Sequence, residues 1–194
     1  MAANPSQNDW KTAWDLRSDT IYLNHGSFGP SPRSVIEARS QWQTEMESQP
    51  MDFFVRKFAD ALLLTRQRLA EFLVAQPEDL VLVENATQAM NVIANSFPLQ
   101  ADDQVLLTDH EYGAVRRIWE ATCRQASAEV TTVSLPEFFT DPQEVVDALF
   151  AACTNRTRLI VISHITSPTA ITLPVDKICQ RAQQEGVQVC VDGP

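Results

Sequence analysis

A short turn of small and polar residues, Asn85-Ala86-Thr87-Gln88, follows an apolar segment and precedes a predicted helix. The first amides of a helix have no acceptor within the helix, and the helix dipole is positive there. Small side chains let an anion approach these amides, and the Thr87 hydroxyl adds a donor, so the turn could bind a phosphate group. The alternative is an ordinary helix cap, because Asn-Ala-Thr is a short motif.

Asp192 follows the apolar run 187–191. A carboxylate at the end of a central strand is buried, and a lone buried charge is costly unless a cation meets it. A protonated pyridine nitrogen would be such a cation, and the carboxylate would keep the ring protonated so that it acts as an electron sink. Asp192 could instead cap a following helix.

His110, Thr166 and Ser167 also follow predicted strands. The imidazole of His110 could stack on a flat cofactor ring, or it could be a loop histidine bonded to a backbone carbonyl. The hydroxyls of Thr166 and Ser167 could donate to a phenolic oxygen, although such residues are common in loops. An anion-binding turn, an imidazole platform, a hydroxyl pair and a strand-end aspartate are together what pyridoxal phosphate (PLP) needs. His110 and Asp192 are therefore the catalytic candidates.

Other ligands fit the sequence less well. It has no Gly-x-Gly-x-x-Gly or Gly-x-x-x-x-Gly-Lys-Ser/Thr motif, which disfavours a dinucleotide-binding or P-loop fold. The four cysteines lie among apolar residues without Cys-x-x-Cys spacing, so we expect reduced, buried thiols and no metal site. The net charge of −10 argues against nucleic acid or an anionic membrane as a partner. The polar N-terminus and the lack of a long apolar run predict a soluble, cytoplasmic protein.

The candidate residues need elements that bring strand ends to one edge of a sheet. We predict strands at 80–83, 104–107, 130–133, 159–162 and 187–191, and helices at 87–95, 114–125, 142–152 and 175–184. Strands that are apolar on both faces lie inside a sheet that helices cover. The predicted fold class is therefore α/β, with a mostly parallel sheet and helices on both faces. In such sheets ligands bind at the carboxyl ends of the strands.

An N-terminal helical arm precedes the sheet in this prediction. A short extended piece at Tyr22-Leu23 leads into a turn-rich loop at 24–30. A helix covers 31–47, Gln49-Pro50 breaks it, and a second helix covers 54–74. We assign residues 1–52 to an arm and helix that contribute to a small domain, and residues 53–194 to the N-terminal part of a large PLP-binding domain.

The chain resembles the class V aminotransferases, which are fold type I PLP-dependent enzymes, and is most similar to their isopenicillin N epimerase-like branch. The resemblance covers about residues 22–194 and rests on segments that occur in order: 22–29 (YLNHGSFG), 49–56 (QPMDFFVR), 85–89 (NATQA), 108–114 (TDHEYGA), 163–169 (SHITSPT) and 191–194 (VDGP). It implies the major domain of a PLP-dependent transferase, incomplete in this chain, with PLP as the cofactor.

The resemblance implies roles for the residues at the sheet edge. Ala86 and Thr87, together with the amide of Gln88, match the phosphate cradle of the family. His110 matches the residue that stacks on the pyridine ring. Asp192 matches the partner of the pyridine nitrogen.

Further roles follow from the same resemblance. Ser167, or its neighbour Thr166, matches the contact to the 3-oxygen of the ring, where many relatives carry asparagine. His25 and Gly26 match a loop that lines the substrate side. Arg56 is a candidate for substrate or subunit contact, or else a solvated helix charge.

The Schiff-base lysine of the family is the feature that this sequence lacks. It normally follows the strand-end aspartate by some tens of residues, whereas the lysines here are Lys11, Lys57 and Lys177. We therefore expect a fragment of a protein about twice as long, inactive on its own because no lysine serves as internal aldimine and general base.

The full-length protein is expected to act on an amino acid or small amine through an external aldimine and to form a homodimer. Epimerisation, transamination and carbon–sulfur cleavage stay open as reactions, and a cysteine desulfurase-like lyase would need a cysteine on a downstream loop. The alternative from another class of protein is a catalytically dead, truncated remnant that binds a partner or nothing.

Overall fold

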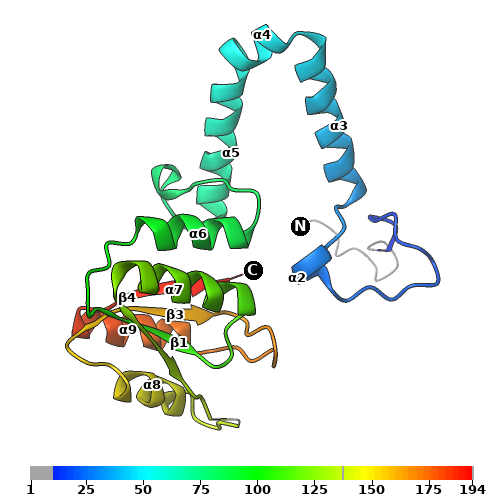
Figure 1. Cartoon of the computed structure of the whole chain (residues 1–194). Coiled ribbons are helices and arrows are strands. Elements are labelled where there is room, and N and C mark those ends of the chain that lie inside the picture. Colours follow the sequence, from blue (N-terminus) through cyan, green and yellow to red (C-terminus); the bar gives the residue numbers. More distant parts are fainter. Residues whose placement is uncertain (1–10, 137, 194) are drawn as a thin grey trace. The chain divides into compact units, whose positions relative to one another are not determined.

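The computed structural model describes residues 11–136 and 138–193 and divides them into two compact units (Figure 1). The first unit ends at Leu82, and the second begins at Val83. The predicted division at residue 52 concerns the domains of the whole protein and stays a prediction.

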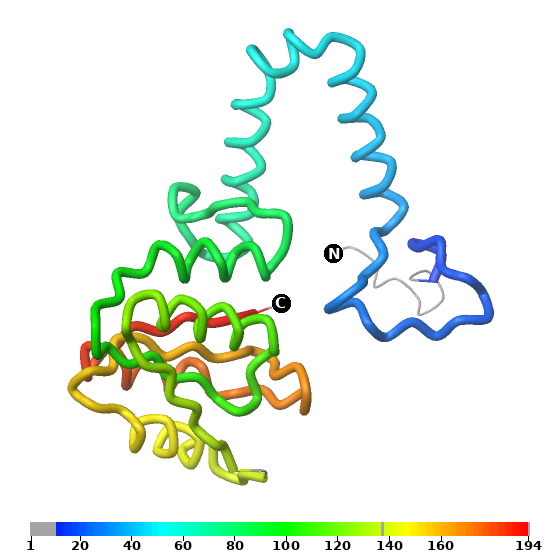
Figure 2. The backbone as a smooth tube through the Cα atoms, viewed as in Figure 1, coloured from blue at the N-terminus to red at the C-terminus, as the bar shows by residue number. Residues whose placement is uncertain are grey.

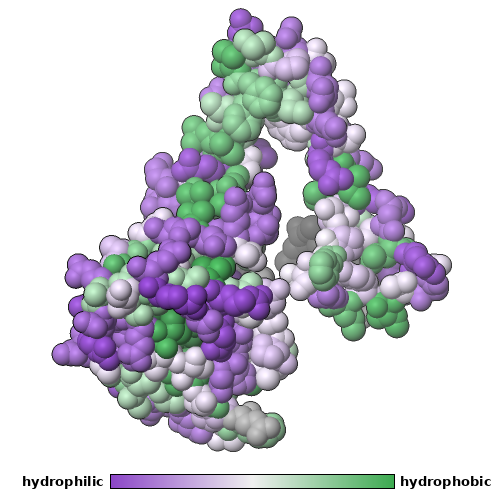
Figure 3. Space-filling view, viewed as in Figure 1, coloured by the Kyte–Doolittle hydropathy of each residue, from purple (hydrophilic) through white to green (hydrophobic). Residues whose placement is uncertain are grey.

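The first unit is helical, as predicted. Its elements are α2 (His25–Phe28), α3 (Arg33–Ser48), α4 (Pro50–Asp52), the π-helix η1 (Phe53–Lys57), α5 (Phe58–Leu73) and the 3-10 helix η2 (Pro77–Asp79). The extended backbone of Gln49 separates α3 from α4, which confirms the predicted break before a proline. Apolar side chains stay exposed along η1 and α5, among them Phe54, Val55 and Phe72, and Figure 3 shows apolar surface over this part of the unit.

The turn-rich loop predicted at 24–30 contains one short helix, α2. α2 closes with a hydrogen bond from the Phe28 amide to the Asn24 carbonyl oxygen at 3.3 Å. A Cβ atom at Gly29 would lie 2.5 Å from the carbonyl oxygen of His25, so only glycine fits directly after this helical turn.

The second unit contains a four-stranded parallel sheet. β1 (Gln104–Thr108), β2 (Glu129–Val133), β3 (Thr157–Ser163) and β4 (Gln188–Asp192) lie in the order β2-β1-β3-β4. The helices of this unit are α6 (Ala86–Ser96), α7 (Gly113–Ala126), α8 (Pro142–Ala151) and α9 (Val175–Glu185). These bounds agree with the predicted elements to within about two residues, the usual scatter of helix and strand ends.

Helices cover both faces of the sheet, which confirms the predicted α/β class (Figures 1 and 2). On one face, side chains of α8 and α9 pack against Leu106, Ile160 and Ile162. On the other face, side chains of α6 and α7 pack against Val105, Leu107 and other inner residues of β1 and β3. The inner strands β1 and β3 are therefore apolar on both sides, as the sequence pattern required.

The predicted strand at 80–83 is the one strand that the structure lacks. Val81 is 77% exposed, and the segment forms no ladder with any described strand. A strand exists only where a neighbouring backbone supplies hydrogen bonds, and neither β2 nor β4, the edges of the sheet, pairs with this segment. Apolar composition alone predicted a strand that has no partner here.

Candidate active site

The carboxyl ends of β1, β3 and β4 lie side by side at one edge of the sheet. They end at Thr108, Ser163 and Asp192, and Ser163 is the register partner of Asp192. α6 runs opposite to the strands and begins at the same edge (Figures 1 and 2). The second unit therefore gathers the polar turn of α6 and the strand-end residues on one side, as ligand sites of parallel sheets require.

Asp192 is a largely buried residue at this edge, and its carboxylate oxygens keep some contact with solvent. Its residue is 9% exposed, and burial raises the pKa of the carboxyl group above its ordinary value. The amide of His164 donates to the Asp192 carbonyl oxygen at 2.8 Å, which holds the end of β4 in place. No hydrogen bond from residues 11–136 or 138–193 reaches the carboxylate oxygens. A cationic group that entered the site would satisfy this carboxylate.

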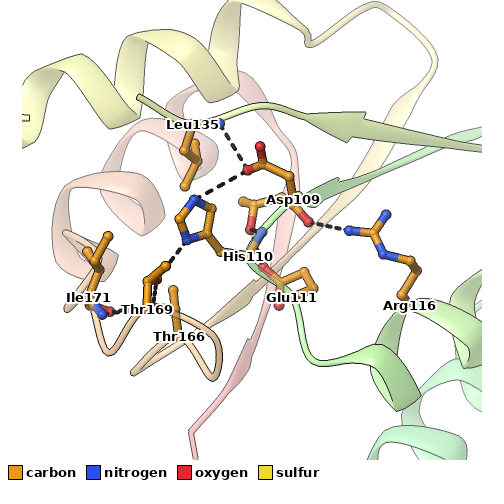
Figure 4. Close-up of polar contacts among 9 residues, drawn as sticks. Asp109, His110, Glu111, Arg116, Leu135, Thr166, Thr169 and Ile171 are labelled. Carbon is orange, nitrogen blue, oxygen red and sulfur yellow. Dashed lines mark hydrogen bonds and ion pairs between the residues drawn. The ribbon is translucent and has the colours of Figure 1, made fainter. Parts of the chain in front are cut away.

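His110 is held on two sides in the loop after β1 (Figure 4). Its Nδ1 atom lies 2.8 Å from the hydroxyl of Thr169, and its Nε2 atom lies 3.6 Å from Oδ1 of Asp109. That Asp109 oxygen also accepts a hydrogen bond from the amide of Leu135 at 3.1 Å. The histidine is thus bonded to a side-chain hydroxyl, and the backbone-carbonyl partner considered from the sequence is absent from the described contacts. Such contacts fix the plane of the ring.

Of the two predicted hydroxyl residues, Thr166 belongs to the cluster and Ser167 does not. Thr166 is buried, and its hydroxyl accepts a hydrogen bond from the Ile171 amide at 2.8 Å and lies 2.8 Å from the Thr169 hydroxyl. Ser167 is exposed and makes no hydrogen bond to the described residues. Thr169 is the residue that the sequence prediction missed, although it ends the quoted 163–169 segment.

The start of α6 leaves fewer free amides than predicted. Asn85 is the N-cap, and its Oδ1 atom accepts a hydrogen bond from the amide of Gln88 at 2.8 Å. The Gln88 side chain in turn accepts from the amide of Glu84 at 2.8 Å. Ala86 and Thr87 are exposed, and no acceptor for their amides is found in the described part of the chain. These two amides and the Thr87 hydroxyl are the donors left for an anion.

Glu111 is a second buried carboxyl group, to which the sequence prediction gave no role. Its two oxygens accept from the hydroxyls of Thr108 at 2.7 Å and of Ser163 at 2.6 Å. Burial raises the pKa of this carboxyl group, and the nearby charge of Asp192 raises it further. The signal was an acidic residue just after a strand, in the quoted 108–114 segment.

The three predicted substrate-side residues belong to the first unit. The His25 ring lies edge-on to the ring of Tyr22, with centroids 5.2 Å apart. Gly26 is in the same short helix. Arg56 forms an exposed ion pair with Asp52 at 2.7 Å. Their substrate-side roles stay predictions.

Comparisons with known proteins place the chain in a family. The profile of the family described as Aminotransferase class-V matches residues 21–194. The isopenicillin N epimerases of Streptomyces clavuligerus and Amycolatopsis lactamdurans are 37% and 41% identical to the chain over 95% and 88% of its length. A solved structure of the cystine C-S lyase C-DES, in complex with its reaction product cysteine persulfide, superposes with a TM-score of 0.81 at 22% identity over 91% of this chain.

The chain spans about half the length of the proteins that it matches. It covers 47% and 44% of the two epimerases and 48% of the C-S lyase chain. Among the described helices, none is both long and apolar enough to cross a membrane.

Proposed function

The chain belongs to the class V aminotransferase family, and from that premise we propose that it forms the PLP-binding part of an enzyme that acts on an amino acid or a small amine. One observation carries this proposal: Asp192 is only 9% exposed, yet its carboxylate oxygens receive no hydrogen bond from the described residues and stay accessible from the site. A carboxylate that is largely withdrawn from water, has no donor in the protein and can still be reached suits a cationic ligand atom, which the protonated ring nitrogen of PLP would supply.

Each part of PLP has residues of this chain suited to it. Asp192 would hold the ring nitrogen, and His110 would lie against the ring. The free amides of Ala86 and Thr87, with the Thr87 hydroxyl, would bind the phosphate. Thr166 lies in the same cluster as His110 and would face the 3-oxygen. When bound, PLP supplies an electron sink that stabilises negative charge at the substrate Cα atom.

In this proposal the residues of the chain bind the cofactor and orient its ring. Asp192, as a carboxylate, favours the protonated form of a nitrogen beside it. Thr169 fixes the imidazole of His110 through the 2.8 Å contact, so the ring does not have to be ordered when the cofactor enters. The hydroxyl of Thr166 is itself held by Ile171, which preorganises the loop after β3.

The lysine that would carry the cofactor comes, in this proposal, from outside these 194 residues. Lys177 is exposed on α9, and Lys57, in the first unit, forms an ion pair with Glu45 at 2.7 Å; the proposal assigns the Schiff-base role to neither. We propose an epimerase-like reaction on an amino acid because the identity to two isopenicillin N epimerases is 37% and 41%. An amino acid is therefore the substrate class that we propose. For the whole protein we propose a homodimer.

A titration with PLP tests the site. PLP binding to the purified protein is followed by absorbance and tryptophan fluorescence, with pyridoxal, which lacks the phosphate, as a second ligand. Thr87→Ala should weaken PLP binding by about tenfold, the value of one hydrogen bond to a charged group, and leave pyridoxal binding unchanged. Thr65→Ala is the matched control, because its exposed hydroxyl donates to the carbonyl oxygen of Ala61 in its own helix. Equal PLP affinity in both variants would defeat the site assignment.

The reaction is tested on the whole protein, including the part that supplies the lysine, with PLP and single L-amino acids. Exchange of the Cα proton with inversion supports an epimerase. Formation of a keto acid would instead indicate a transaminase, and release of sulfide from cysteine or cystine would indicate a C–S lyase. PLP binding without any turnover on added amino acids would favour the non-catalytic alternative.

A further inference from the structure

Glu111 is the one buried ionisable side chain at the described sheet edge that the proposed function leaves without a role. It is 6% exposed, and each of its carboxylate oxygens accepts a short hydrogen bond from a hydroxyl group. The two donors, Thr108 and Ser163, are the last residues of β1 and β3. Glu111 therefore links the ends of two neighbouring strands.

The same carboxyl group is coupled to both candidate catalytic residues. The Thr108 hydroxyl that donates to Glu111 accepts the amide hydrogen of His110 at 3.2 Å. Ser163, the other donor, stands in register with Asp192 on β4. A movement of Glu111 would therefore shift the backbone of His110 and the strand end that carries Asp192.

The surroundings of Glu111 contain more negative than positive groups. The pKa of the Cys190 thiol on β4 is raised to about 11 by burial first, and then by the charges of Asp192 and Glu111, so the three groups share one neighbourhood. The guanidinium of Arg116, on α7, is occupied with the Thr108 carbonyl oxygen at 2.9 Å and the Thr132 hydroxyl at 2.8 Å. The other titratable groups of these loops are Asp109, His110, Tyr112 and His164.

We propose that Glu111 is a positioning residue that acts through Asp192: it ties together the ends of β1 and β3 and places a second negative charge beside the carboxylate that meets the ring nitrogen. The inference rests on the proposed function. In the free protein the two carboxylates repel each other, so a cation that enters between strand ends and loop relieves repulsion as well as satisfying Asp192. Two charges hold the proton of a ring nitrogen more firmly than one.

The test measures that proton directly. PLP labelled with nitrogen-15 in the ring is bound to the purified protein, and the nitrogen chemical shift is followed against pH. Glu111→Gln keeps the shape of the side chain and removes its charge. A unit charge roughly 6–10 Å away, in an effective dielectric of about 20, moves the pKa of a neighbouring group by roughly one to two pH units. The midpoint at which the ring nitrogen loses its proton should fall by that amount in E111Q.

The controls separate charge from structure. Glu120→Gln, an exposed carboxyl on α7, should leave the midpoint unchanged. Ser163→Ala keeps the charge of Glu111 but removes one of its donors, so it should lower the midpoint by a smaller amount, and it decides the question if E111Q does not fold. Circular dichroism monitors folding of each variant.

The outcomes distinguish the two proposals. A wild-type protein that binds no PLP refutes the proposed function, and this inference falls with it. A wild-type protein that binds PLP, with the same nitrogen midpoint in folded E111Q or in S163A, refutes the role of Glu111 and leaves the proposed function standing.

Discussion

Replacing Asp192 with asparagine should change two properties of the protein in opposite directions. The asparagine side chain would keep the size of the aspartate but carry no charge. Because no described residue donates to the Asp192 carboxylate, the whole charge interaction is available to a ligand. A hydrogen bond between charged groups contributes about 1.5–3 kcal/mol, so D192N should weaken PLP binding by roughly 10- to 150-fold.

The free energy of unfolding of the cofactor-free protein should rise near neutral pH in the same variant. Burial raises the folded-state pKa of Asp192 above the ordinary 3.8. A carboxyl group with a raised folded-state pKa contributes stability below its unfolded pKa, and that stability is lost as the pH rises through the folded pKa. At neutral pH the charged carboxylate of Asp192 therefore lowers the free energy of unfolding, and repulsion from Glu111 lowers it further. Because D192N removes this charge, both unfavourable contributions should disappear. Below pH 3.8 the gain should vanish.

The assay combines urea unfolding of the cofactor-free protein at several pH values with PLP titration. Asp60→Asn, an exposed carboxyl in the first turn of α5, is the matched control and should alter neither quantity. The reasoning fails if D192N binds PLP like the wild type. It also fails if D192N loses stability at neutral pH, since that would mean that Asp192 serves the fold rather than a ligand.

Three further outcomes follow from the contacts of the second unit. Thr169→Val should remove the 2.8 Å contact to Nδ1 of His110, so PLP binding should weaken several-fold and the circular dichroism band of the bound cofactor should change. An unchanged band would mean that this contact does not orient the ring. Trp119→Phe removes the hydrogen bond from Nε1 to Sδ of Met90 and part of a fully buried side chain. The free energy of unfolding, measured in urea, should therefore fall by about 1–3 kcal/mol. A decrease below the error of the measurement would contradict the packing of α6 on α7. The pKa of the Cys123 thiol is raised to about 11 by burial, so alkylation by iodoacetamide at mildly alkaline pH should require unfolding; rapid labelling of Cys123 in the folded protein would show that its site opens.

The elements of the second unit could be predicted because their signals are local. The N-cap of α8 is Asp141, whose side chain forms a capping box with that of Glu144, and Pro142 occupies the first helical position. The strands β1 and β3 contain continuous apolar runs, which are typical of the inner strands of a parallel sheet. The segment 80–83 carries the same local signal, and it failed as a strand because pairing depends on a neighbour that a local pattern does not describe.

The sequence by itself determined the α/β alternation, the family and the placement of Asp192 and His110 at the carboxyl ends of strands. These depend on side chains a few residues apart. Only the tertiary structure decided which groups meet: Glu111 with Ser163, 52 residues away, and His110 with Thr169, 59 residues away. Strand order and register bring such residues together, and a hydrogen bond across that separation leaves no periodic mark in the sequence. The structure also showed that the Asn85 cap occupies the Gln88 amide, which leaves the amides of Ala86 and Thr87 and the Thr87 hydroxyl as phosphate donors.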